Sequence, residues 1–358
     1  MKILYGVQGT GEGHLSRARA MARALAHWPV DVTWLFSGRP REQLFDMSVF
    51  GDYLYRTGLS FTVRDGQMQY AATLRNNRFR QCMRDASQLD LSSYDLLVCD
   101  YEPVLALAAR KQQRSLIGIG HQYAFGRKTP TAGASFLQRQ IMSRFAPVDT
   151  PVGLHWHRYA DNILPPILDL PAHPVHKGEH IVVYMPFEDQ QAVTRLLQRF
   201  PEQRFLQYSA AVSDSNCANV ERRKANVAGF KRDLASSAGV ICNSGFELVS
   251  ECLQWRKPVL TKPLHGQMEQ LSNAHALQQL GYATSIHRFD TDGVAAWLDN
   301  PGRCHRITFP DVAGALARWL ATGAYADTAS LGERLWAETV TDRIPVPRPG
   351  RYGAIASA

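Results

Sequence analysis

A glycine-rich loop that ends in a histidine lies close to the start of the chain. It reads GTGEGH from Gly9 to His14 and stands between a short apolar run and a segment whose apolar residues recur at helical spacing. Glycines leave the backbone bare at the start of a helix, where N–H groups can approach a phosphate or a sugar closely. We therefore expect Gly9, Gly11 and Gly13 to line a binding site, with His14 in the first helical turn pointing into it. Alternatively, the glycines only permit a tight turn and the backbone satisfies His14.

This loop departs from the fingerprint of dinucleotide-binding proteins. The fingerprint G-x-G-x-x-G would place its third glycine at His14, and the segment VTWLFSGRP lacks the acid expected about 20 residues further on. Both departures disfavour a nicotinamide cofactor. The chemistry that remains is proton transfer by His14, with Glu12 beside it as a second candidate catalytic residue. Asp100, at the end of an apolar run, is either the N-cap of the next helix or a third candidate, a carboxylate of the same site.

A second candidate site opens with the sequence NSGFE, from Asn243 to Glu247, which follows the apolar run GVIC and begins a helix. Unpaired N–H groups, the positive end of the helix dipole and the Ser244 hydroxyl together favour an anion such as a diphosphate. Glu251 lies four residues after Glu247, on the same helix face, where its carboxylate could accept hydrogen bonds from two vicinal hydroxyls. The alternative for Glu251 is an ordinary solvated helix acid.

Polar residues also follow two further apolar runs. After PVLTKP comes the loop HGQMEQ, and side chains that donate and accept together suit a sugar ring, which presents alternating donors and acceptors. The candidates in this loop are His265, Gly266, Gln267, Glu269 and Gln270. After SLIGIG, His121 and Gln122 are expected to line the side that receives an acceptor molecule, with a structural role as the alternative.

No metal ion is expected. The six cysteines show no CxxC or CxH spacing, which argues against a zinc site and against a disulfide framework. Asp290-Thr291-Asp292 has the DxD spacing that some metal-dependent enzymes use. Because it precedes the helical segment GVAAWLDN, it is better explained as a helix N-cap with acids in the first turn.

Apolar runs alternate with segments of helical spacing, a pattern typical of a parallel sheet covered by helices on both faces. A proline-rich stretch without periodic signal divides the chain. The sequence therefore predicts an α/β fold of two doubly wound, Rossmann-like domains over 1–150 and 179–335. A linker over 151–178 would join them, and a loosely ordered tail would follow over 336–358. Open α/β sheets bind ligands beyond the carboxyl ends of their strands, so both domains should face one cleft.

Length and composition agree with this organisation. The chain has 358 residues, of which 45% are hydrophobic and 20% charged, more than one hydrophobic core usually holds. It shows no apolar window near the roughly 18 residues of a membrane span, and its first residues lack the layout of a signal peptide. We expect a cytoplasmic protein.

The positive charge is concentrated in the first half. Residues 1–150 contain 19 Lys and Arg against 12 Asp and Glu, whereas residues 151–358 contain 21 against 20. This balance favours anionic partners such as phosphates or an acidic membrane surface. Nucleic acid is not expected, because the chain has no helix-turn-helix, RNP-like strand or zinc-finger pattern. The stretch 135–145, SFLQRQIMSRF, either packs on the core or contacts a membrane.

Three segments carry a resemblance to a known family: GTGEGH, NSGFELVSEC and KPVLTKPLHGQMEQLSNA. They resemble the signature regions of nucleotide-sugar glycosyltransferases of the GT-B fold, most closely family 28, which includes the GlcNAc transferase of the lipid-linked peptidoglycan precursor. Within that family, MKILYGVQGTGEGHLSRARAMARAL, DLLVCDYEPVLALAA and GIGHQ are similar to a bacterial and archaeal branch of predicted transferases. The resemblance extends over about residues 1–330.

The resemblance implies roles for individual residues of the second half. Glu251 matches the carboxylate that holds the donor's ribose. Ser244, Gly245 and Phe246 match the helix start beneath the diphosphate. Glu269 and Gln270 match the pair that reads the hydroxyls of the donor sugar.

For the first half, the resemblance implies that Gly11, Gly13 and His14 belong to the loop at the reaction centre. One departure concerns the turn after the first strand of the second domain. It is glycine-rich in related enzymes but reads YMPFED over residues 184–189 here, which disfavours phosphate contacts from this turn. UDP is the nucleotide that the family commonly uses.

We therefore expect an inverting, metal-independent hexosyl- or N-acetylhexosaminyl-transferase with a UDP-sugar as co-substrate and no cofactor. The second domain would hold the donor, and the basic first domain would present an acceptor hydroxyl, lipid-linked or otherwise anionic, at the inner face of the membrane. His14 would remove the proton of that hydroxyl. The alternatives are a UDP-sugar 2-epimerase of the same architecture, which needs no acceptor, and a nucleotide-sugar binding protein without turnover.

Overall fold

The first domain is built on a sheet of 7 strands in the order β3-β2-β1-β6-β7-β8-β9, in which every neighbouring pair runs parallel. The computed structural model of the chain describes residues 1–133, 135–302, 306–325 and 327–342. The strands of this sheet are β1 (Lys2–Gln8), β2 (Asp31–Ser37), β3 (Leu54–Tyr55), β6 (Leu96–Asp100), β7 (Ile117–Gly120), β8 (Thr150–Leu154) and β9 (Ile163–Leu164). The other elements of this half are α1 (Glu12–Leu25), the hairpin of β4 (Val63–Arg64) and β5 (Gln67–Met68), α2 (Tyr70–Asn76), α3 (Phe79–Gln88), α4 (Pro103–Lys111) and α5 (Phe136–Phe145), with short 3-10 turns η1 (Arg41–Gln43), η2 (Ser48–Phe50) and η3 (His121–Ala124).

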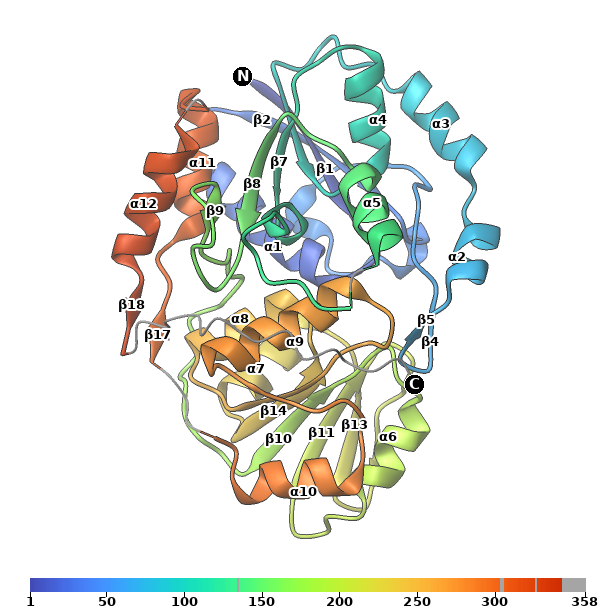
Figure 1. Cartoon of the computed structure of the whole chain (residues 1–358), viewed down its shortest axis with the longest axis vertical. Helices are drawn as coiled ribbons and strands as arrows, with labels where there is room; N and C mark the ends of the chain where they lie inside the picture. Colours follow the sequence, from blue (N-terminus) through green and yellow to red (C-terminus); the bar gives the residue numbers. More distant parts are fainter. Residues whose placement is uncertain (134, 303–305, 326, 343–358) are drawn as a thin grey trace.

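The second domain, below the first in Figure 1, repeats the plan. Its 7 strands have the order β12-β13-β11-β10-β14-β15-β16, and all pairs are parallel except β12 with β13. The strands are β10 (His180–Tyr184), β11 (Arg204–Ser209), β12 (Ser215–Cys217), β13 (Val220–Lys224), β14 (Gly239–Asn243), β15 (Val259–Lys262) and β16 (Thr284–Ser285). The helices are α6 (Gln190–Leu197), α7 (Val227–Ala235), α8 (Phe246–Gln254), α9 (Met268–Leu280) and α10 (Thr291–Asp299).

Both sheets are buried on both faces, as alternate residues of the central strands show. In β1, Ile3 and Val7 pack in the core that contains α1, while Leu4 packs in a separate core with α4. In β10, Val182 and Val183 likewise point into different cores. Such continuous apolar strands are typical of parallel sheets with helices on each side. The predicted α/β fold of two doubly wound domains is confirmed.

The predicted linker over 151–178 is wrong in its first part. Strands β8 and β9 lie within or at the edge of that range, and they extend the first sheet, β8 beside β7 and β9 beside β8. The proline-rich composition hid them, because β9 is a short edge strand and β8 beside it carries Pro151 close to its start, where proline is tolerated. The first domain therefore continues at least to Leu164.

The predicted second domain over 179–335 also loses its end to the first domain. Helices α11 (Val312–Thr322) and α12 (Thr328–Glu338) return to the first sheet, where α11 packs on α1 and α12 on β9. Figure 1 shows both helices beside the upper domain. Leu316 and Leu320 are buried in the core shared with α1, and Trp336 Nε1 donates to the carbonyl of Ile163 at 2.7 Å. Burial of this apolar face accounts for the crossing.

The start of the predicted tail over 336–358 is ordered. It includes the end of α12 and β18 (Val340–Thr341), which pairs antiparallel with β17 (Ile307–Thr308), whereas residues 343–358 lie outside the described part of the chain. None of the described helices combines the length and apolar composition that a membrane-spanning helix needs.

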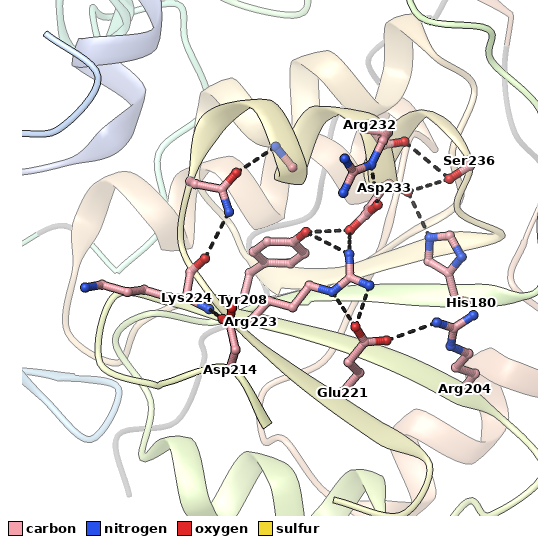
Figure 2. A network of polar contacts seen from close by, with 12 residues as sticks. His180, Arg204, Tyr208, Asp214, Glu221, Arg223, Lys224, Arg232, Asp233 and Ser236 are labelled. Carbon is pink, nitrogen blue, oxygen red and sulfur yellow. Dashed lines mark hydrogen bonds and ion pairs between the residues drawn. The ribbon is translucent and has the colours of Figure 1, made fainter. Parts of the chain in front are cut away.

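A polar network fixes α7 to the second sheet (Figure 2). Arg223 of β13 donates to Glu221 at 2.8 Å and pairs with Asp233 of α7. The hydroxyl of Tyr208, on β11, donates to the same Asp233 carboxylate. The network sets the position of α7 and thereby of Lys231, which reaches the site described next.

Candidate active site

The glycine loop places His14 beside Asp100. Gly9 N donates to the carbonyl of Ser37 at 2.7 Å, and Gly11 occupies the N-cap of α1, so His14 stands in the first helical turn as predicted. Asp100 ends β6, directly next to β1 in the sheet. His14 Nδ1 lies 2.8 Å from Asp100 Oδ1, and no described residue hydrogen-bonds to Nε2.

The structure excludes the N-cap alternative for Asp100, whose role as a carboxylate of the site stays a prediction. The N-cap of α4 is Glu102, whose carboxylate accepts from the N–H groups of Val104 and Leu105 at 2.9 and 2.6 Å. Asp100 is therefore free of a capping role. Burial raises the pKa of Asp100, but the charges of Arg17 and His14 outweigh it and hold this pKa below its ordinary value.

Arg17 completes this cluster and was not predicted. Its Nε donates to Asp100 Oδ2 at 3.0 Å and its Nη2 to Asp100 Oδ1 at 2.8 Å. Nη2 also lies 2.8 Å from His14 Nδ1, and Nη1 forms an ion pair with Glu247 of the second domain. Burial lowers the pKa of Arg17, yet the two carboxylates outweigh it and raise this pKa overall. The sequence places Arg17 three residues after His14, on the same face of the helix, and this spacing could have indicated that the two side chains act together.

Glu12, the second predicted catalytic residue, is engaged elsewhere. Its carboxylate pairs with Arg39, whose Nη2 also donates to the carbonyl of Thr10 at 2.9 Å. The pair ties the glycine loop to the end of β2. This geometry favours Asp100, rather than Glu12, as the partner of His14.

The start of α8 has the features of the predicted anion site. Gly245 is the N-cap without a side-chain cap, so the first N–H groups of the helix lack such a partner. Ser244 Oγ and Asn243 Oδ1 are buried, and neither has a hydrogen-bond partner among the described residues. Unpaired buried polar atoms are costly, which makes this helix start a candidate ligand site.

Glu247 and Glu251 of α8 both face the first domain. Burial raises the pKa of Glu247 to about 8, more than the neighbouring Arg17 lowers it. Glu251 pairs with Lys231 of α7 and accepts from Ser16 Oγ at 3.3 Å. Both contacts use Oε1, and no described residue hydrogen-bonds to Oε2. Lys231 was not predicted from the sequence. Glu251 is thus a buried acid, not the solvated one of the alternative reading.

The turn after β10, which departs from the resembled family, carries an acid into the same region. Glu188 accepts from Lys262 Nζ at 2.8 Å and from Asn243 Nδ2 at 3.1 Å. Lys262 ends β15, beside Asn243 at the end of β14. Glu188 and Lys262 were missed by the sequence reading, although both follow apolar strands.

Residues of the first domain contact the loop of the second domain that is predicted to bind the donor sugar. The hairpin of β4 and β5 docks on it: His265 N donates to the carbonyl of Gly66 at 2.8 Å, and Met68 N donates to that of His265 at 3.0 Å. The Gly266 carbonyl accepts from Gln138 Nε2 of α5 at 3.1 Å. The backbone groups of His265 and Gly266 thus contact the first domain.

The other residues of this loop have distinct surroundings. Gln122 Nε2 donates to Glu269 Oε2 at 3.0 Å across the domain interface. Gln270 Oε1 accepts from the N–H of Leu264 at 3.0 Å, so this side chain shapes its own loop. Gln267, the N-cap of α9, has a buried Oε1 with no partner among the described residues.

His121 has the structural role of the alternative reading. It is fully buried, with Nδ1 2.8 Å from the carbonyl of Leu154 and Nε2 2.7 Å from Asn273 Oδ1. Its ring stacks on Phe246, with ring centroids 4.0 Å apart. Burial lowers the pKa of His121. The Phe246 ring therefore packs in the interface, which leaves its backbone N–H for a ligand.

Within the described residues, no three His, Cys, Asp or Glu side chains gather as a metal ion would require. Asp290 caps α10 by accepting from Gly293 N at 2.9 Å, as predicted. A cavity of about 100 Å³ lies at the amino end of β15, lined by residues such as Pro258 and Tyr282. That is the edge of the sheet opposite the candidate site.

Comparison with known proteins decides the family. The sequence matches glycosyl transferase family 1 over residues 1–300. The chain belongs to this family. The predicted enzyme class, a glycosyltransferase, is confirmed, while the resemblance to family 28 in particular stays a prediction. No curated protein is similar enough to count as a match.

Three solved structures of glycosyltransferases are similar in fold to this chain. The glycotransferase of kitacinnamycin has 16% sequence identity and a TM-score of 0.57, with 94% of this chain and 97% of that chain covered. CalG4, the calicheamicin glycosyltransferase, has 14% identity and a TM-score of 0.54 over 94% and 97%. SsfS6 of Streptomyces sp. SF2575, complexed with thymidine diphosphate, has 13% identity and a TM-score of 0.54 over 94% and 95%. At these identities the likeness confirms the GT-B fold.

Proposed function

We propose that this member of glycosyl transferase family 1 is an inverting, metal-independent enzyme that moves a hexosyl or N-acetylhexosaminyl group from a UDP-sugar to an acceptor hydroxyl. One observation carries the proposal. The His14–Asp100 pair, 2.8 Å apart, lies across the domain interface from the start of α8, where Ser244 Oγ is buried without a partner among the described residues. This arrangement supports a proton acceptor on one side of the interface and an anion site on the other.

In this mechanism His14 donates its Nδ1 proton to Asp100 in a hydrogen bond, which leaves the lone pair of Nε2 for the acceptor hydroxyl. The acceptor oxygen bonds to the anomeric carbon as the bond from that carbon to the diphosphate oxygen breaks on the opposite face. The hydroxyl proton passes to His14, and UDP leaves. Configuration at the anomeric carbon is inverted.

Negative charge grows on the departing diphosphate, and the second domain supplies its stabilisation. The first N–H groups of α8, with Ser244 Oγ, are fixed donors at the positive end of a helix dipole. In a site from which water is excluded, preorganised donors of this kind stabilise the negative charge of the leaving group, as a divalent cation does in other transferases. We therefore expect the reaction to proceed without a metal ion.

Glu251 is the proposed ribose ligand, because its Oε2 has no partner among the described residues while Oε1 is held by Lys231. A carboxylate fixed in this way can accept from a ribose hydroxyl at little entropic cost. The neighbour SsfS6 was complexed with thymidine diphosphate. UDP and TDP are accordingly compared in the assay below.

The experiment combines nucleotide binding with turnover. Calorimetry with UDP and TDP measures donor-site affinity, and release of UDP from a panel of UDP-sugars measures turnover with candidate acceptors and with EDTA. His14→Ala should reduce turnover by about 10² to 10⁴ and leave the UDP affinity unchanged. Glu338→Gln, at an exposed position in α12, is the matched surface control.

Near-normal turnover by His14→Ala would contradict the proposed base. Loss of activity in EDTA, restored by magnesium or manganese, would contradict metal independence. Conversion of UDP-GlcNAc alone to its 2-epimer would instead establish the epimerase.

An acidic membrane surface is the proposed location of a lipid-linked acceptor. Exposed apolar side chains gather on α2, α3 and α5, namely Leu74, Phe79, Met83, Phe136 and Ile141. These helices lie along one side of the first domain (Figure 1), and a side-chain hydrogen bond joins α2 to α5. Exposed arginines on the same helices are Arg75, Arg80, Arg84 and Arg144. Apolar groups flanked by arginines favour insertion beside anionic headgroups.

Sedimentation with vesicles tests this location. The protein should bind vesicles that contain phosphatidylglycerol more strongly than vesicles of phosphatidylcholine alone, and high salt should weaken the binding. Replacing Leu74, Phe79 and Phe136 together by serine should abolish most of it. Val340→Ser, an exposed apolar residue far along the chain, should have no effect. Equal binding to both vesicles, or none, would contradict the proposal.

A further inference from the structure

A salt bridge joins the end of β15 to the turn after β10, beside the start of α8. Lys262 Nζ donates to Glu188 Oε1 at 2.8 Å, and Asn243 Nδ2 donates to the same oxygen at 3.1 Å. Among the described residues, Nζ has no other acceptor. The side chains of Lys262 and Glu188 are only 12% and 13% exposed. An ammonium group with unused donors therefore lies next to the proposed diphosphate site.

The hairpin of β4 and β5 in the first domain covers this salt bridge (Figure 1). Gly66 N donates to the carbonyl of Phe187 at 2.8 Å, and a Cβ atom at Gly66 would lie 2.6 Å from Lys262 Nζ. The salt bridge therefore faces the interface between the domains, where the hairpin excludes most water from it. Charges interact more strongly in such surroundings than in bulk water.

The groups around the salt bridge are donors, with one exception. Ser244 is fully buried, and its Oγ has no hydrogen-bond partner among the described residues. A buried hydroxyl without a partner marks a place where a ligand can complete the site. Ser244 Oγ, the first N–H groups of α8 and Lys262 Nζ can all donate to a phosphate. The exception is Glu188, whose carboxylate would repel an anion.

The order of residues along the site indicates which phosphate Lys262 would contact. Glu251, the proposed ribose ligand, lies within α8, and Ser244 precedes that helix. Lys262 pairs with Asn243 in the sheet and leads into the loop over 265–270 that is predicted to bind the sugar. A nucleotide sugar has the same order of parts: ribose, proximal phosphate, distal phosphate and sugar. Lys262 thus corresponds to the distal phosphate, which is bonded to the sugar.

We propose that Lys262 binds the distal phosphate of the donor and that Glu188 takes the place of this phosphate in the unliganded protein. The inference rests on the proposed function, in which the start of α8 binds the diphosphate. When the donor binds, a phosphate oxygen replaces Glu188 Oε1 on Lys262 Nζ, and the carboxylate turns towards water. Lys262 then stabilises the charge that grows on the distal phosphate as its bond to the sugar breaks. When UDP leaves, Glu188 returns.

The two residues of this salt bridge therefore have opposite effects on nucleotide binding. A buried ammonium group without a counter-ion is costly, and Glu188 supplies the counter-ion while the phosphate is absent. Once the phosphate is bound, the same carboxylate is a second anion beside it, and like charges repel. Lys262 strengthens the binding of UDP, whereas Glu188 weakens it. A salt bridge with only a structural role would give effects of the same sign.

Calorimetry with UDP and with UMP tests the proposal in wild type, Lys262→Met, Lys262→Arg and Glu188→Gln. Lys262→Met should weaken UDP binding by about 10- to 10²-fold, because a hydrogen bond to a charged group is lost. Lys262→Arg keeps the charge and should retain most of the affinity. Glu188→Gln should strengthen UDP binding by about 10-fold, because it removes the like charge and leaves an acceptor for Lys262. UMP lacks the distal phosphate and should bind all four proteins with similar affinity.

Weaker UDP binding in both Lys262→Met and Glu188→Gln would show a structural role and overturn the proposal. Unchanged UDP affinity in both variants, or equal changes for UDP and UMP, would also overturn it. Arg334→Gln and Glu338→Gln remove the same kinds of charge from an exposed ion pair of 3.9 Å and should leave the UDP affinity unchanged. If Lys262→Met does not fold, the double variant with Glu188→Gln, which contains neither charge, is compared with Glu188→Gln alone.

Turnover separates this inference from the proposed function. If the variants shift the UDP affinity in opposite directions but wild type releases UDP from no UDP-sugar, the inference stands and the proposed transfer reaction fails. If wild type turns over and both variants bind UDP as tightly as wild type does, the inference fails alone. If wild type binds no UDP, both fail.

Discussion

Replacing Gly13 by alanine tests how closely the two domains must approach. The added Cβ would lie 2.8 Å from Glu247 Cγ and 3.5 Å from Glu247 Cβ. Restoring an ordinary contact requires α1 and α8 to separate by roughly 1 Å, and a misplacement of that size can cost about 10²-fold in rate. Folding should not suffer, because alanine is favoured over glycine in a helix by about 1 kcal/mol.

We therefore expect Gly13→Ala to lower kcat for UDP release by about 10- to 10²-fold, with the UDP affinity and the thermal midpoint nearly unchanged. Steady-state kinetics, calorimetry with UDP and thermal denaturation measure the three quantities. Gly126→Ala, where the new Cβ would meet nothing within 4 Å, is the control and should behave as wild type. A Gly13→Ala enzyme with wild-type kcat would refute the reasoning that this contact positions the site.

Three further predictions follow from the buried residues. Glu251→Gln should weaken UDP binding by at least about 10-fold in calorimetry, since a hydrogen bond to a charged group contributes about 1.5–3 kcal/mol; unchanged affinity would contradict the ribose assignment. Burial lowers the pKa of His155 and so favours its neutral imidazole in the folded protein. The free energy of unfolding should therefore fall as the pH drops below about 6.5, by up to about 1.4 kcal/mol per pH unit. The free energy of unfolding, measured by urea denaturation at pH 7.5 and 5.5, should fall less in His155→Asn than in wild type. Equal falls in the two proteins would contradict this prediction. Phe246→Ala, which removes the ring stacked on His121, should reduce the free energy of unfolding by about 3–5 kcal/mol, and a loss below 1 kcal/mol would show that the stack matters little.

The fold was predictable where strands are buried on both faces. Continuous apolar runs mark β1, β6 and β14, because a parallel sheet covered by helices removes all their side chains except that of Lys2 from water. Strand β13 was not predicted, because its sequence VERRK has the composition of a polar loop. Its arginine Arg223 is satisfied by Asp233 on α7, a partner that no local pattern reveals.

The candidate site was predictable in its parts but not in its connections. Motif spacing located His14, Asp100 and the start of α8. The sequence did not indicate that Arg17 links them, because an arginine in an amphipathic helix is usually solvated and only the tertiary fold buries it between two carboxylates. Lys231 was missed for the same reason.

The predicted domain boundaries were wrong for a different physical reason. Strand β9 is a short edge strand and its neighbour β8 contains Pro151, while α11 and α12 cross back to the first domain to bury their apolar faces. Such long-range burial leaves no mark in local periodicity. The polar residues that hold the domains together, such as Gln122 with Glu269, are likewise non-local.

The helix start after Asn243 is proposed to receive a nucleotide diphosphate. A crystal structure of the protein soaked with UDP tests it most directly. We expect both phosphates within hydrogen-bond distance of the backbone N–H groups of Phe246 and Glu247 and of Ser244 Oγ, with a ribose hydroxyl on Glu251. Density for the nucleotide at the glycine loop before α1, with the start of α8 still covered by the first domain, would contradict the account.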